Sequence, residues 1–396
     1  MITRILLHII ILCSLSFYNV TFLGTLARYF NLLGVVLIIF LIFLFIIYGE
    51  SGQFKKHFTW PIILILIGVL LSTGFCYIFY NQSIFYTFWE QKEMFLYLGY
   101  FMVHLMKPNP KEIERIIGVY AIVFIVFYFV QYMIYPVEIF NVDMWQNRGT
   151  IRIALPGITF LIIGYFLFFQ TFLQTNKFLH FLRCFLILLI AVLLGGRQLI
   201  SVLVLMTIII LILSKRIKNR FLIYLLVIIG LIPLYFIFYN IFHELIKATF
   251  VNVNRGSEDI RLKALRYFLL DSFPNTISYL TGNGAPSETS NYGRGISTIA
   301  GKYRFFLSDI GIIGNYYLYG MFFLVGVLLI FFRITLLKIS SNHKYLQYFF
   351  ASLFIMLPMG GGFAYGELIF PLILFLYLID VSNYQIKESL RIKSTS

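Results

Sequence analysis

Charged residues are scarce in this chain, and their scarcity excludes most soluble folds. Asp, Glu, Lys and Arg make up only 12% of the 396 residues, whereas 60% are hydrophobic and 19% are aromatic. A soluble domain of this length cannot bury that much apolar surface. Apolar runs of about 18 to 25 residues recur along the chain, and each is long enough to cross about 30 Å of hydrocarbon. We therefore predict an all-α polytopic membrane protein, because a barrel would show alternating segments of about 10 residues instead.

Cysteine clusters and metal-binding patterns are also missing. The three cysteines, Cys13, Cys76 and Cys184, all fall within apolar runs, so no disulfide framework is expected. No spacing of metal ligands is evident, and we expect neither a metal nor another cofactor. The first loop expected to face outward, residues 19–28, contains no Asp or Glu. Metal-dependent membrane glycosyltransferases hold a divalent cation with an acid in that loop, and this chain has no such acid there.

Acidic residues are outnumbered by basic ones, which gives the chain a formal net charge of +15. The basic residues fall mostly in alternate short loops, which is the positive-inside pattern of membrane proteins and not a nucleic-acid surface. We predict one membrane domain over residues 1–396 in the cytoplasmic (inner) membrane, with both termini in the cytoplasm. About twelve spans are predicted, at residues 4–22, 29–49, 59–80, 84–106, 113–135, 152–173, 178–195, 197–214, 220–242, 305–332, 345–358 and 364–381.

The longest polar stretch, residues 243–304, lies between two predicted spans and is expected to face outward. It predicts one short amphipathic helix, with Ser257 as its N-cap and with Glu258 and Asp259 in its first turn, where they complement the helix dipole. Pro274 is expected to end this helix, and the following GNG sequence predicts a turn. The apolar face of the helix is predicted to consist of Ile260, Ala264, Leu265, Phe268 and Leu269.

Arginines gather in the regions that are expected to face outward. A second outward loop is predicted at residues 136–151, and Gly195 and Gly196 permit a tight turn that brings Arg197 to the same side. Arginine suits bidentate contact with phosphate oxygens, so the set predicts a site for a lipid-linked pyrophosphate. The alternative for each arginine is contact with a lipid headgroup or a helix C-terminus. The set comprises Arg148, Arg152, Arg197, Arg255, Arg261, Arg266 and Arg294.

Acidic and aromatic side chains on the outward side add further candidates. Asp309 and Glu367 lie near the outer ends of predicted spans, where an acid is either functional or paired with an arginine. Trp145 and Tyr303 are candidate sugar contacts, with an interfacial aromatic belt as the alternative. The acids expected on this side are Glu90, Glu93, Glu138, Asp143, Glu244, Glu258, Asp259, Asp271, Glu288, Asp309 and Glu367.

The order of four stretches along the sequence is informative. They are NRGTIRIALPGITFLIIGYF, LLGGRQLISVLVLMTIIILIL, RLKALRYFLLDSFPNTISYLTGNG and KYRFFLSDIGIIGNYYLYG. In order and spacing they resemble four elements of the O-antigen polymerase and ligase superfamily. These are an outward arginine element, a small residue and an arginine before a long helix, an outward loop with G-x-G, and an acid before G-x-x-G. The resemblance covers about half of the chain.

The resemblance implies a metal-independent C-type membrane glycosyltransferase that uses undecaprenyl-pyrophosphate-linked oligosaccharides outside the membrane. Arg197 and Arg261 would bind the pyrophosphate and stabilise it as the leaving group. The base that activates the acceptor hydroxyl is left open, with Asp309, Glu258 and Asp259 as candidates on reach alone. The remaining contacts to pyrophosphate or glycan would come from Arg148, Arg152, Arg255, Arg266, Arg294, Tyr303 and Trp145.

One departure from the superfamily bears on the type of transfer. Its ligases carry a His just before the aromatic stretch, whereas Ser297 to Gly301 of this chain contain none. This favours a polymerase of O-antigen, capsule or exopolysaccharide repeat units, with a ligase or a lipid-linked oligosaccharide flippase as alternatives. The long outward loop argues against a flippase. A membrane acyltransferase would call for a catalytic His and a pair of Arg residues near the cytoplasmic side, and neither pattern is evident. Expected partners are the lipid-linked glycans, membrane lipid and a chain-length regulator protein, without nucleic acid.

Overall fold

The structure is a computed structural model that describes residues 2–48, 56–147, 150–213, 239, 243–244, 246–247, 258–358, 360 and 362–395. The described residues are mostly helical and include one antiparallel hairpin of β1 (Met144–Asn147) and β2 (Thr150–Ile153). The α-helices are α1 (Ile2–Ser14), α2 (Ala27–Tyr48), α3 (Thr59–Tyr80), α4 (Ile84–Glu90), α5 (Gly99–Met106), α6 (Pro110–Ile134), α7 (Ile158–Thr175), α8 (Phe178–Leu193), α9 (Arg197–Leu213), α12 (Ile260–Arg266), α13 (Thr276–Thr281), α14 (Asn291–Tyr303), α15 (Ile312–Leu336), α16 (Lys344–Met356) and α17 (Gly366–Thr395). Short 3-10 segments are η1 (Ser16–Asn19), η2 (Thr21–Leu26), η3 (Lys92–Leu98), η6 (Leu307–Ile310) and η7 (Gly362–Ala364), and η5 (Tyr267–Asp271) is a π-helical turn.

Long apolar helices dominate the described part of the fold. Besides six long stretches, the shorter helices α1, α8 and α9 are also apolar and have 13 to 17 residues. The long helices confirm the predicted class of an α-helical protein embedded in a membrane, because soluble helices of this length carry a polar face. Six stretches in the described residues are long and apolar enough to cross a membrane, namely Tyr29–Ile47, Thr59–Tyr80, Pro110–Ile134, Ile158–Thr175, Ile312–Leu336 and Gly366–Ser389.

Several predicted spans differ from the helices that form. α1 ends at Ser14 and is followed by two 3-10 segments, so the helix is shorter than the span predicted at 4–22. The span predicted at 84–106 is divided into α4, η3 and α5, because the polar run that begins at Glu90 interrupts it. The span predicted at 220–242 lies outside the described residues except for residue 239. The number of membrane crossings therefore stays a prediction.

Helix α17 lies at the centre of the hydrophobic core. Its stretch from Leu368 to Ile379 is almost fully buried, and it packs against α1, α5, α6, α7 and η3. This stretch, LIFPLILFLYLI, is apolar on all faces, which is the pattern of a helix surrounded by others. The surrounding helices therefore fix α17 along the bundle, with its first turn at one side of the bundle and its C-terminal part at the other.

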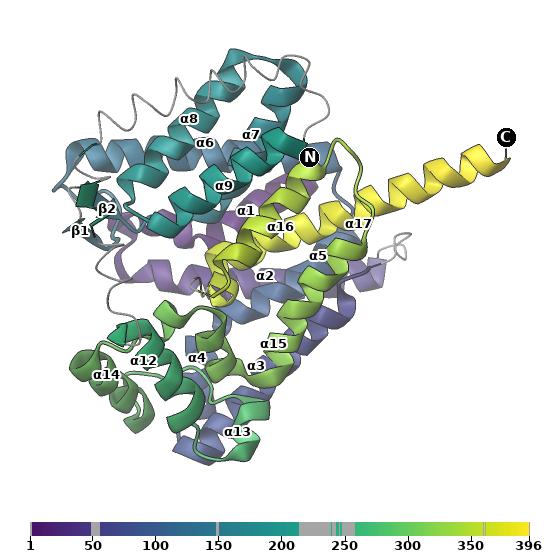
Figure 1. The fold of residues 1–396 in the computed structure, drawn as a ribbon. Coiled ribbons are helices and arrows are strands. Elements are labelled where there is room, and N and C mark those ends of the chain that lie inside the picture. Colours follow the sequence, from purple (N-terminus) through teal and green to yellow (C-terminus); the bar gives the residue numbers. More distant parts are fainter. Residues whose placement is uncertain are drawn as a thin grey trace.

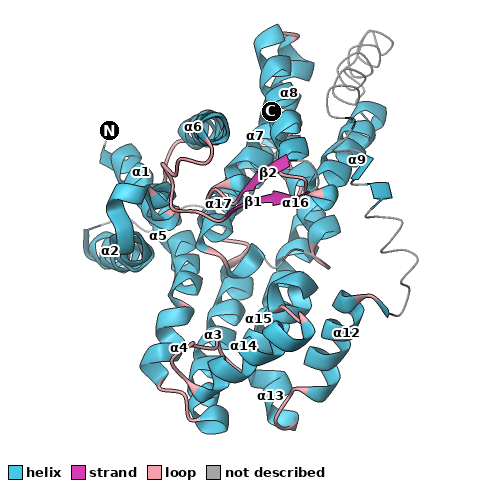
Figure 2. Cartoon of the chain, turned by 90° about the vertical axis from the view of Figure 1, so that its left-hand side faces the viewer, coloured by secondary structure: helices cyan, strands magenta, loops and turns pink. Residues whose placement is uncertain are grey.

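The hairpin marks one end of this bundle. In Figure 1 the hairpin, α12 and α14 lie on the left, whereas the C-terminal part of α17 projects on the right. Figure 2 views the molecule from the side of the hairpin, so that α2 and α6 are seen nearly end-on. We call the side that carries β1 and β2 the hairpin end, and the other side the opposite end.

The long loop begins differently from the prediction. Ser257 lies outside the described residues, and Asp259 is the N-cap of α12, with its Oδ1 accepting a hydrogen bond from the backbone N of Arg261 at 2.8 Å. The helix therefore begins two residues later than predicted, and the prediction that Asp259 stands inside the first turn was wrong. The short Asp side chain reaches the backbone N–H two residues ahead, which is the geometry of a cap. α12 ends at Arg266 and continues into the π-helical turn η5.

Two further helices follow in the loop where the prediction had none. α13 begins at a capping box in which Asn275 accepts from the backbone N of Ser278 at 3.0 Å. α14 begins at Ser290, whose Oγ accepts from the backbone N of Gly293 at 2.9 Å. α13 leaves its apolar residues Ile277 and Leu280 exposed, so no buried apolar face marks it, and its capping box defines where it begins. α14 does place apolar residues at helical spacing, and its Ile296 and Ile299 pack against the cluster that contains Ala264 and Phe268 of the loop, so the prediction missed a pattern that was present.

The second half of the long loop is fixed to α3 and α15. Gln82, which is buried between α3 and α4, donates from Nε2 to the carbonyl of Ala285 at 2.8 Å and accepts at Oε1 from Ser287 N at 3.0 Å. The predicted GNG turn does not form: Gly282 adopts φ +77°, but the segment runs beside α15, with Asn283 N and Gly284 N donating to the carbonyls of Tyr317 and Leu318. Gly282 meets Gly320 of α15 so closely that a Cβ on either would lie 2.4 to 2.6 Å from backbone atoms of the other segment. Only glycine fits this contact, which holds the loop on the bundle.

Candidate functional site

The hairpin holds one basic and one aromatic residue of the predicted site together. Trp145 of β1 and Arg152 of β2 face each other in register, and the guanidinium lies 5.2 Å from the centre of the indole ring. Arg152 Nε donates to the carbonyl of Leu194 at 2.7 Å, and Thr150 Oγ1 donates to the carbonyl of Leu193 at 2.9 Å. Both carbonyls belong to the end of α8, where unpaired carbonyls attract cations. Arg152 therefore contacts a helix C-terminus, and partial burial lowers its pKa.

The turn after α8 brings Arg197 next to the hairpin. Gly195 adopts φ +61°, as the predicted tight turn requires, and a Cβ on it would lie 3.8 Å from the side chain of Arg152. Arg197 is the first residue of α9. The next residue, Gln198, donates from Nε2 to the carbonyl of Met356 at 3.0 Å, which connects α9 to the end of α16. Two of the predicted outward arginines are thus neighbours through one turn.

The contacts continue from α16 to α15 and α17. The backbone N of Ile312 donates to the carbonyl of Leu357 at 3.1 Å, which places η6 and its Asp309 beside the end of α16. Glu367, in the first turn of α17, accepts at Oε2 from the backbone N of Gly157 at 2.9 Å. Gly157 caps α7 and follows β2 by four residues, so this bond returns to the hairpin. The ends of α7, α8, α9, α15, α16 and α17 therefore meet around one region of the hairpin end.

Three carboxylates surround an exposed tyrosine in this region. Glu93 of η3 accepts at Oε2 from the backbone N of Gly366 at 2.6 Å, so it lies at the start of α17 beside Glu367. Tyr365 is 47% exposed, and its pKa is raised by burial of its hydroxyl and by the negative charges of Glu367, Glu93 and Asp309. No Lys, Arg or His among the described residues forms an ion pair with any of the three acids. They form an acidic group beside the basic hairpin.

The loop residues of the predicted site lie on α12 and α14, where they face solvent. Arg261 and Arg266 are exposed on α12, whose buried face packs against Ile310, the residue after Asp309. Glu258 is exposed and forms an ion pair with Lys263, so a helix-end role accounts for it. α12 thus lies beside the acidic group, and within the described ranges no ion pair joins Arg261 or Arg266 to it.

The remaining predicted residues are placed as follows. Arg294 is exposed on α14, where its Nη2 donates to Asn291 Oδ1 at 2.6 Å. Tyr303 is half-exposed at the end of α14, with Lys302 over its ring. Arg148 and Arg255 lie outside the described residues. The structure therefore brings Trp145 and Arg152 together with the turn that leads to Arg197. Arg261, Arg266 and Arg294 lie exposed on α12 and α14 instead.

Glu93 of the acidic group and the neighbouring Tyr365 had no assigned role in the sequence analysis. Glu93 appeared there only as one outward acid among many, and Tyr365 did not appear. A signal for Glu93 was present, since WEQKEM places four polar residues in the middle of an apolar run and η3 forms there. No comparable signal exists for Tyr365, because its position depends on contacts between segments far apart in the sequence.

A second acidic site lies toward the opposite end of α17. Asp380 is 1% exposed and accepts at Oδ1 from Nδ1 of His57 at 2.8 Å and from the backbone N of His57 at 3.3 Å. Its Oδ2 accepts from the hydroxyl of Tyr100 at 2.6 Å and from Nε2 of His104 at 3.1 Å. Arg333 at the end of α15 donates to the carbonyl of His57. Asp380 therefore joins α3, α5, α15 and α17 in one buried network.

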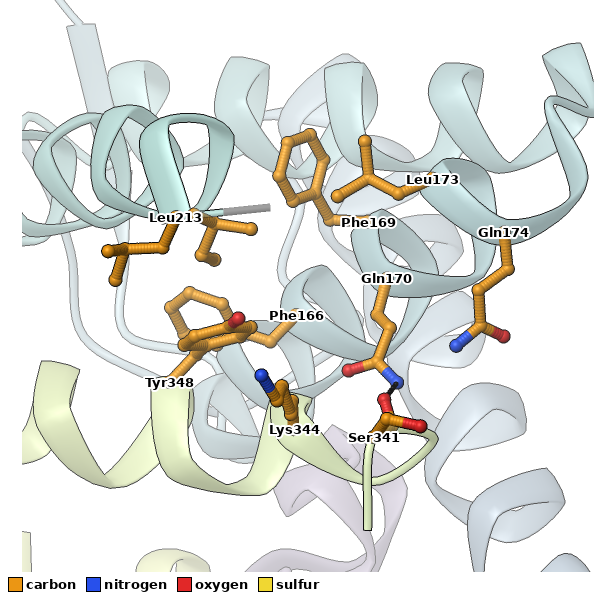
Figure 3. A pocket seen from close by; sticks show the side chains of 10 residues that line it. Phe166, Phe169, Gln170, Leu173, Gln174, Leu213, Ser341, Lys344 and Tyr348 are labelled. Carbon is orange, nitrogen blue, oxygen red and sulfur yellow. Dashed lines mark hydrogen bonds between the residues drawn. The ribbon is translucent and has the colours of Figure 1, made fainter. Parts of the chain in front are cut away.

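A cavity of about 180 Å³ lies between α7, α9 and α16, away from the hairpin end (Figure 3). Phe166 and Phe169 line it, the side chain of Lys344 faces it, and Gln170 is engaged with the carbonyl of Ser341 at 3.3 Å. None of the predicted site residues lines it, and its apolar walls surround a single cation. We assign the cavity no role in the site.

Comparison of the chain with protein-family models, with curated proteins and with solved structures finds no match. Within the described ranges, no group of three or more His, Cys, Asp and Glu side chains is arranged to hold a metal ion. The geometry therefore provides a basic pair on the hairpin and turn, and an acidic group beside it, at one end of a bundle of apolar helices.

Proposed function

We propose that this protein is a membrane glycosyltransferase that polymerises undecaprenyl-pyrophosphate-linked oligosaccharide repeat units on the outer face of the cytoplasmic membrane. The observation that carries the proposal is the meeting of Arg152, Trp145 and the turn to Arg197 at the end of the bundle where Glu367 also lies. A cationic group and an acidic group at one membrane surface suit a substrate with a charged leaving group and a hydroxyl nucleophile.

Each part of the site has a role in this reaction. Arg197 and Arg152 would hold the pyrophosphate and stabilise the negative charge that grows on it as the bond to the anomeric carbon breaks. Trp145, whose ring is 40% exposed, would contact a sugar. The hydroxyl of a second lipid-linked repeat unit would attack the anomeric carbon, forming the new glycosidic bond. Asp309 lies in the acidic group as one candidate for the proton, and the exposed Arg261, with the other loop arginines, would guide the anionic substrate.

The proposed orientation places the hairpin end outside the cell. Basic residues cluster at the opposite end, where α5 ends before Lys107, α15 ends near Arg333, and α16 begins at Lys344. Lys and Arg concentrate on the cytoplasmic side of membrane proteins, so this distribution supports an outward hairpin end and cytoplasmic termini. α17 fills the centre of the described bundle, which supports a transferase more than a flippase, since a flippase needs a central path.

The experiment is a glycan ladder from cells that lack the protein and from cells that carry Arg197→Ala. Loss of a polymerase leaves glycans with a single repeat unit, because the unit is still exported and transferred. Loss of a flippase leaves no repeat unit at the outer surface, and loss of a ligase leaves polymer that is not transferred. We expect single-unit products in both strains. Full-length polymer in cells with Arg197→Ala would remove the role assigned to Arg197.

The matched control is Arg115→Ala. Arg115 is exposed near the start of α6, at the opposite end of the bundle. It has the same charge and side-chain length as Arg197, so its replacement tests whether loss of one basic residue matters in general. We expect a ladder like that of the unmodified protein, with both variants present in the membrane at equal amounts.

A further inference from the structure

One oxygen of Glu367 is unoccupied, although the residue lies within the bundle. Its Oε2 accepts the hydrogen bond from Gly157, whereas no described residue donates to Oε1. The side chain keeps partial access to solvent at the hairpin end. A carboxylate that only capped α7 would gain most by bonding through both oxygens or by lying in open water. Glu367 Oε1 is therefore the carboxylate oxygen that the described residues leave open to a ligand.

Glu93 is a second carboxylate beside Glu367 at the start of α17. Both of its oxygens are occupied, Oε2 by the backbone N of Gly366 and Oε1 by Asn31 Nδ2 at 2.5 Å. Since Gly366 directly precedes Glu367, the two carboxylates lie at the same turn. Glu93 has both oxygens engaged, so Glu367 is the acid with an oxygen left to receive a proton.

Asn31 points to a ligand beside these acids. This residue of α2 is 6% exposed, and its Oδ1 has no hydrogen-bond donor within the part of the chain that is described. A buried acceptor left unpaired costs about 1–3 kcal/mol, so such an atom calls for a donor from outside the chain. The amide is held beside Glu93 by its Nδ2, which puts the unpaired oxygen next to the acidic group. A sugar hydroxyl is a donor of the right size.

Tyr365 supplies a surface for the same ligand. Its ring is 47% exposed and stands among Glu367, Glu93 and Asp309. An exposed aromatic face next to carboxylate and amide oxygens is the usual composition of a sugar subsite, because the ring packs on C–H bonds while the oxygens accept from hydroxyl groups. The aromatic side chain of Tyr365 thus makes a glycan a better fit than an inorganic cation.

We infer that Glu367 Oε1 accepts the proton of the attacking hydroxyl group of the acceptor glycan, and that Asn31 Oδ1 binds a neighbouring hydroxyl of that glycan. This inference rests on the proposed function. The acceptor oxygen forms its bond to the anomeric carbon, and its proton passes to Glu367. The bond from that carbon to the pyrophosphate oxygen breaks, and its electron pair leaves with the lipid pyrophosphate held by the arginines. Glu93 is a positioning residue, since it contacts Asn31 and the turn that carries Glu367.

The test uses the full-length protein in lipid vesicles, with lipid-linked repeat units extracted from cells that lack it. Glu367→Gln keeps an oxygen for Gly157 but cannot take a proton. We expect polymerisation to fall about 100- to 10,000-fold, the usual contribution of a general base, with an unchanged elution profile and melting temperature. Glu367→Ala leaves room for a small carboxylate, so added formate should restore activity to this variant and not to Glu367→Gln.

The control and the binding residue complete the test. Glu90→Gln removes an exposed carboxylate three residues from Glu93 and should leave the rate unchanged. Asn31→Ala should raise the concentration of repeat unit needed for half-maximal rate more than it lowers the maximal rate. Full activity of Glu367→Gln, or the absence of formate rescue, overturns the inference while the proposed function stands. Failure of the unmodified protein to extend the repeat units overturns the proposed function itself.

Discussion

Helix α17 carries an acid near each end of its buried stretch, and the two acids are bonded very differently. Asp380 accepts from two groups on each of its oxygens, supplied by His57, Tyr100 and His104, and is 1% exposed. Among the described residues only Gly157 donates to Glu367, which is less deeply buried than Asp380. The two residues are thirteen positions apart, or about 20 Å along a helix. The same helix therefore presents a saturated carboxylate and an unsaturated one.

The difference separates a structural acid from one that is available for chemistry. A buried carboxylate is tolerated only when other groups replace its water, and Asp380 has that replacement in full. His104 shows how complete the network is, because its Nδ1 faces the carbonyl of Tyr100 at 2.9 Å while its Nε2 faces Asp380. Both ring nitrogens of His104 therefore face oxygen atoms of this network. A carboxylate in this state has no lone pair to offer a substrate, whereas Glu367 has.

The largest expected effect comes from Asp380→Ala. The change leaves the donors of His57, Tyr100 and His104 buried without an acceptor, which costs about 3–5 kcal/mol for a broken buried network. We expect a marked fall in the melting temperature of the detergent-solubilised protein and in its amount in the membrane. Glu367→Ala is the matched control and should cost about 1 kcal/mol, the value of one hydrogen bond. Equal losses of stability in the two variants would abolish the distinction between the two acids.

Tyr100→Phe sharpens the comparison by removing a single donor. It deletes the hydroxyl that donates to Asp380 at 2.6 Å and accepts from the backbone N of Phe58 at 3.2 Å. Since a hydrogen bond to a charged group is lost, we expect a cost of about 1.5–3 kcal/mol, read from thermal unfolding, with polymerisation retained. Tyr128→Phe is the matched control, because the buried hydroxyl of Tyr128 has no partner in the described part of the chain. That change should be neutral or stabilising, and a cost equal to that of Tyr100→Phe would contradict the assignment.

Gly195→Ala tests the hairpin end, where we expect activity to depend more on local geometry than on stability. Gly195 adopts φ +61°, a conformation that costs about 1–2 kcal/mol for a residue with a Cβ. The strain would shift the turn that carries Arg197 away from Arg152, so polymer yield should fall further than the melting temperature. Gly196→Ala is the control, since its Cβ would make only an ordinary 3.7 Å contact with Leu199. A normal glycan ladder from Gly195→Ala would show that this turn is not part of the site.

Local chemistry in the sequence predicted several of these elements, whereas contacts between distant segments decided the rest. The membrane class and the turn at Gly195 follow from apolar runs and glycine positions, and the structure confirms them. Helix α13 was missed because a capping box, rather than a buried apolar face, defines it, whereas the apolar spacing of Ile296 and Ile299 in α14 was overlooked. The break in the predicted span at 84–106 was missed because hydropathy is averaged over a window longer than the polar run.

The candidate site could be predicted only in part, for the same reason. Arginines in outward loops suggested Arg152 and Arg197, but their closeness depends on a hairpin that docks on α8. Glu93 gains its position from the backbone of Gly366, 273 residues later in the chain. No local pattern reports such a contact. The sequence therefore indicated which residue types the site uses, and the packing of the helices selected which of them meet.

The smallest expected change in stability belongs to Glu367→Gln, and it decides the comparison most directly. The amide oxygen of Gln can still accept from Gly157, and its NH2 group would take the place of an oxygen to which no described residue donates, so the free energy of unfolding should change by about 0.5 kcal/mol or less. Asp380→Asn, the equivalent change in the other network, places an NH2 group against donors and leaves at least one of them unpaired at a cost of about 1–3 kcal/mol. Thermal unfolding of the two amide variants, measured side by side in one detergent, checks the difference. If Glu367→Gln proved as costly as Asp380→Asn, Glu367 would be a structural acid like Asp380, and its open oxygen would have no claim on the acceptor's proton.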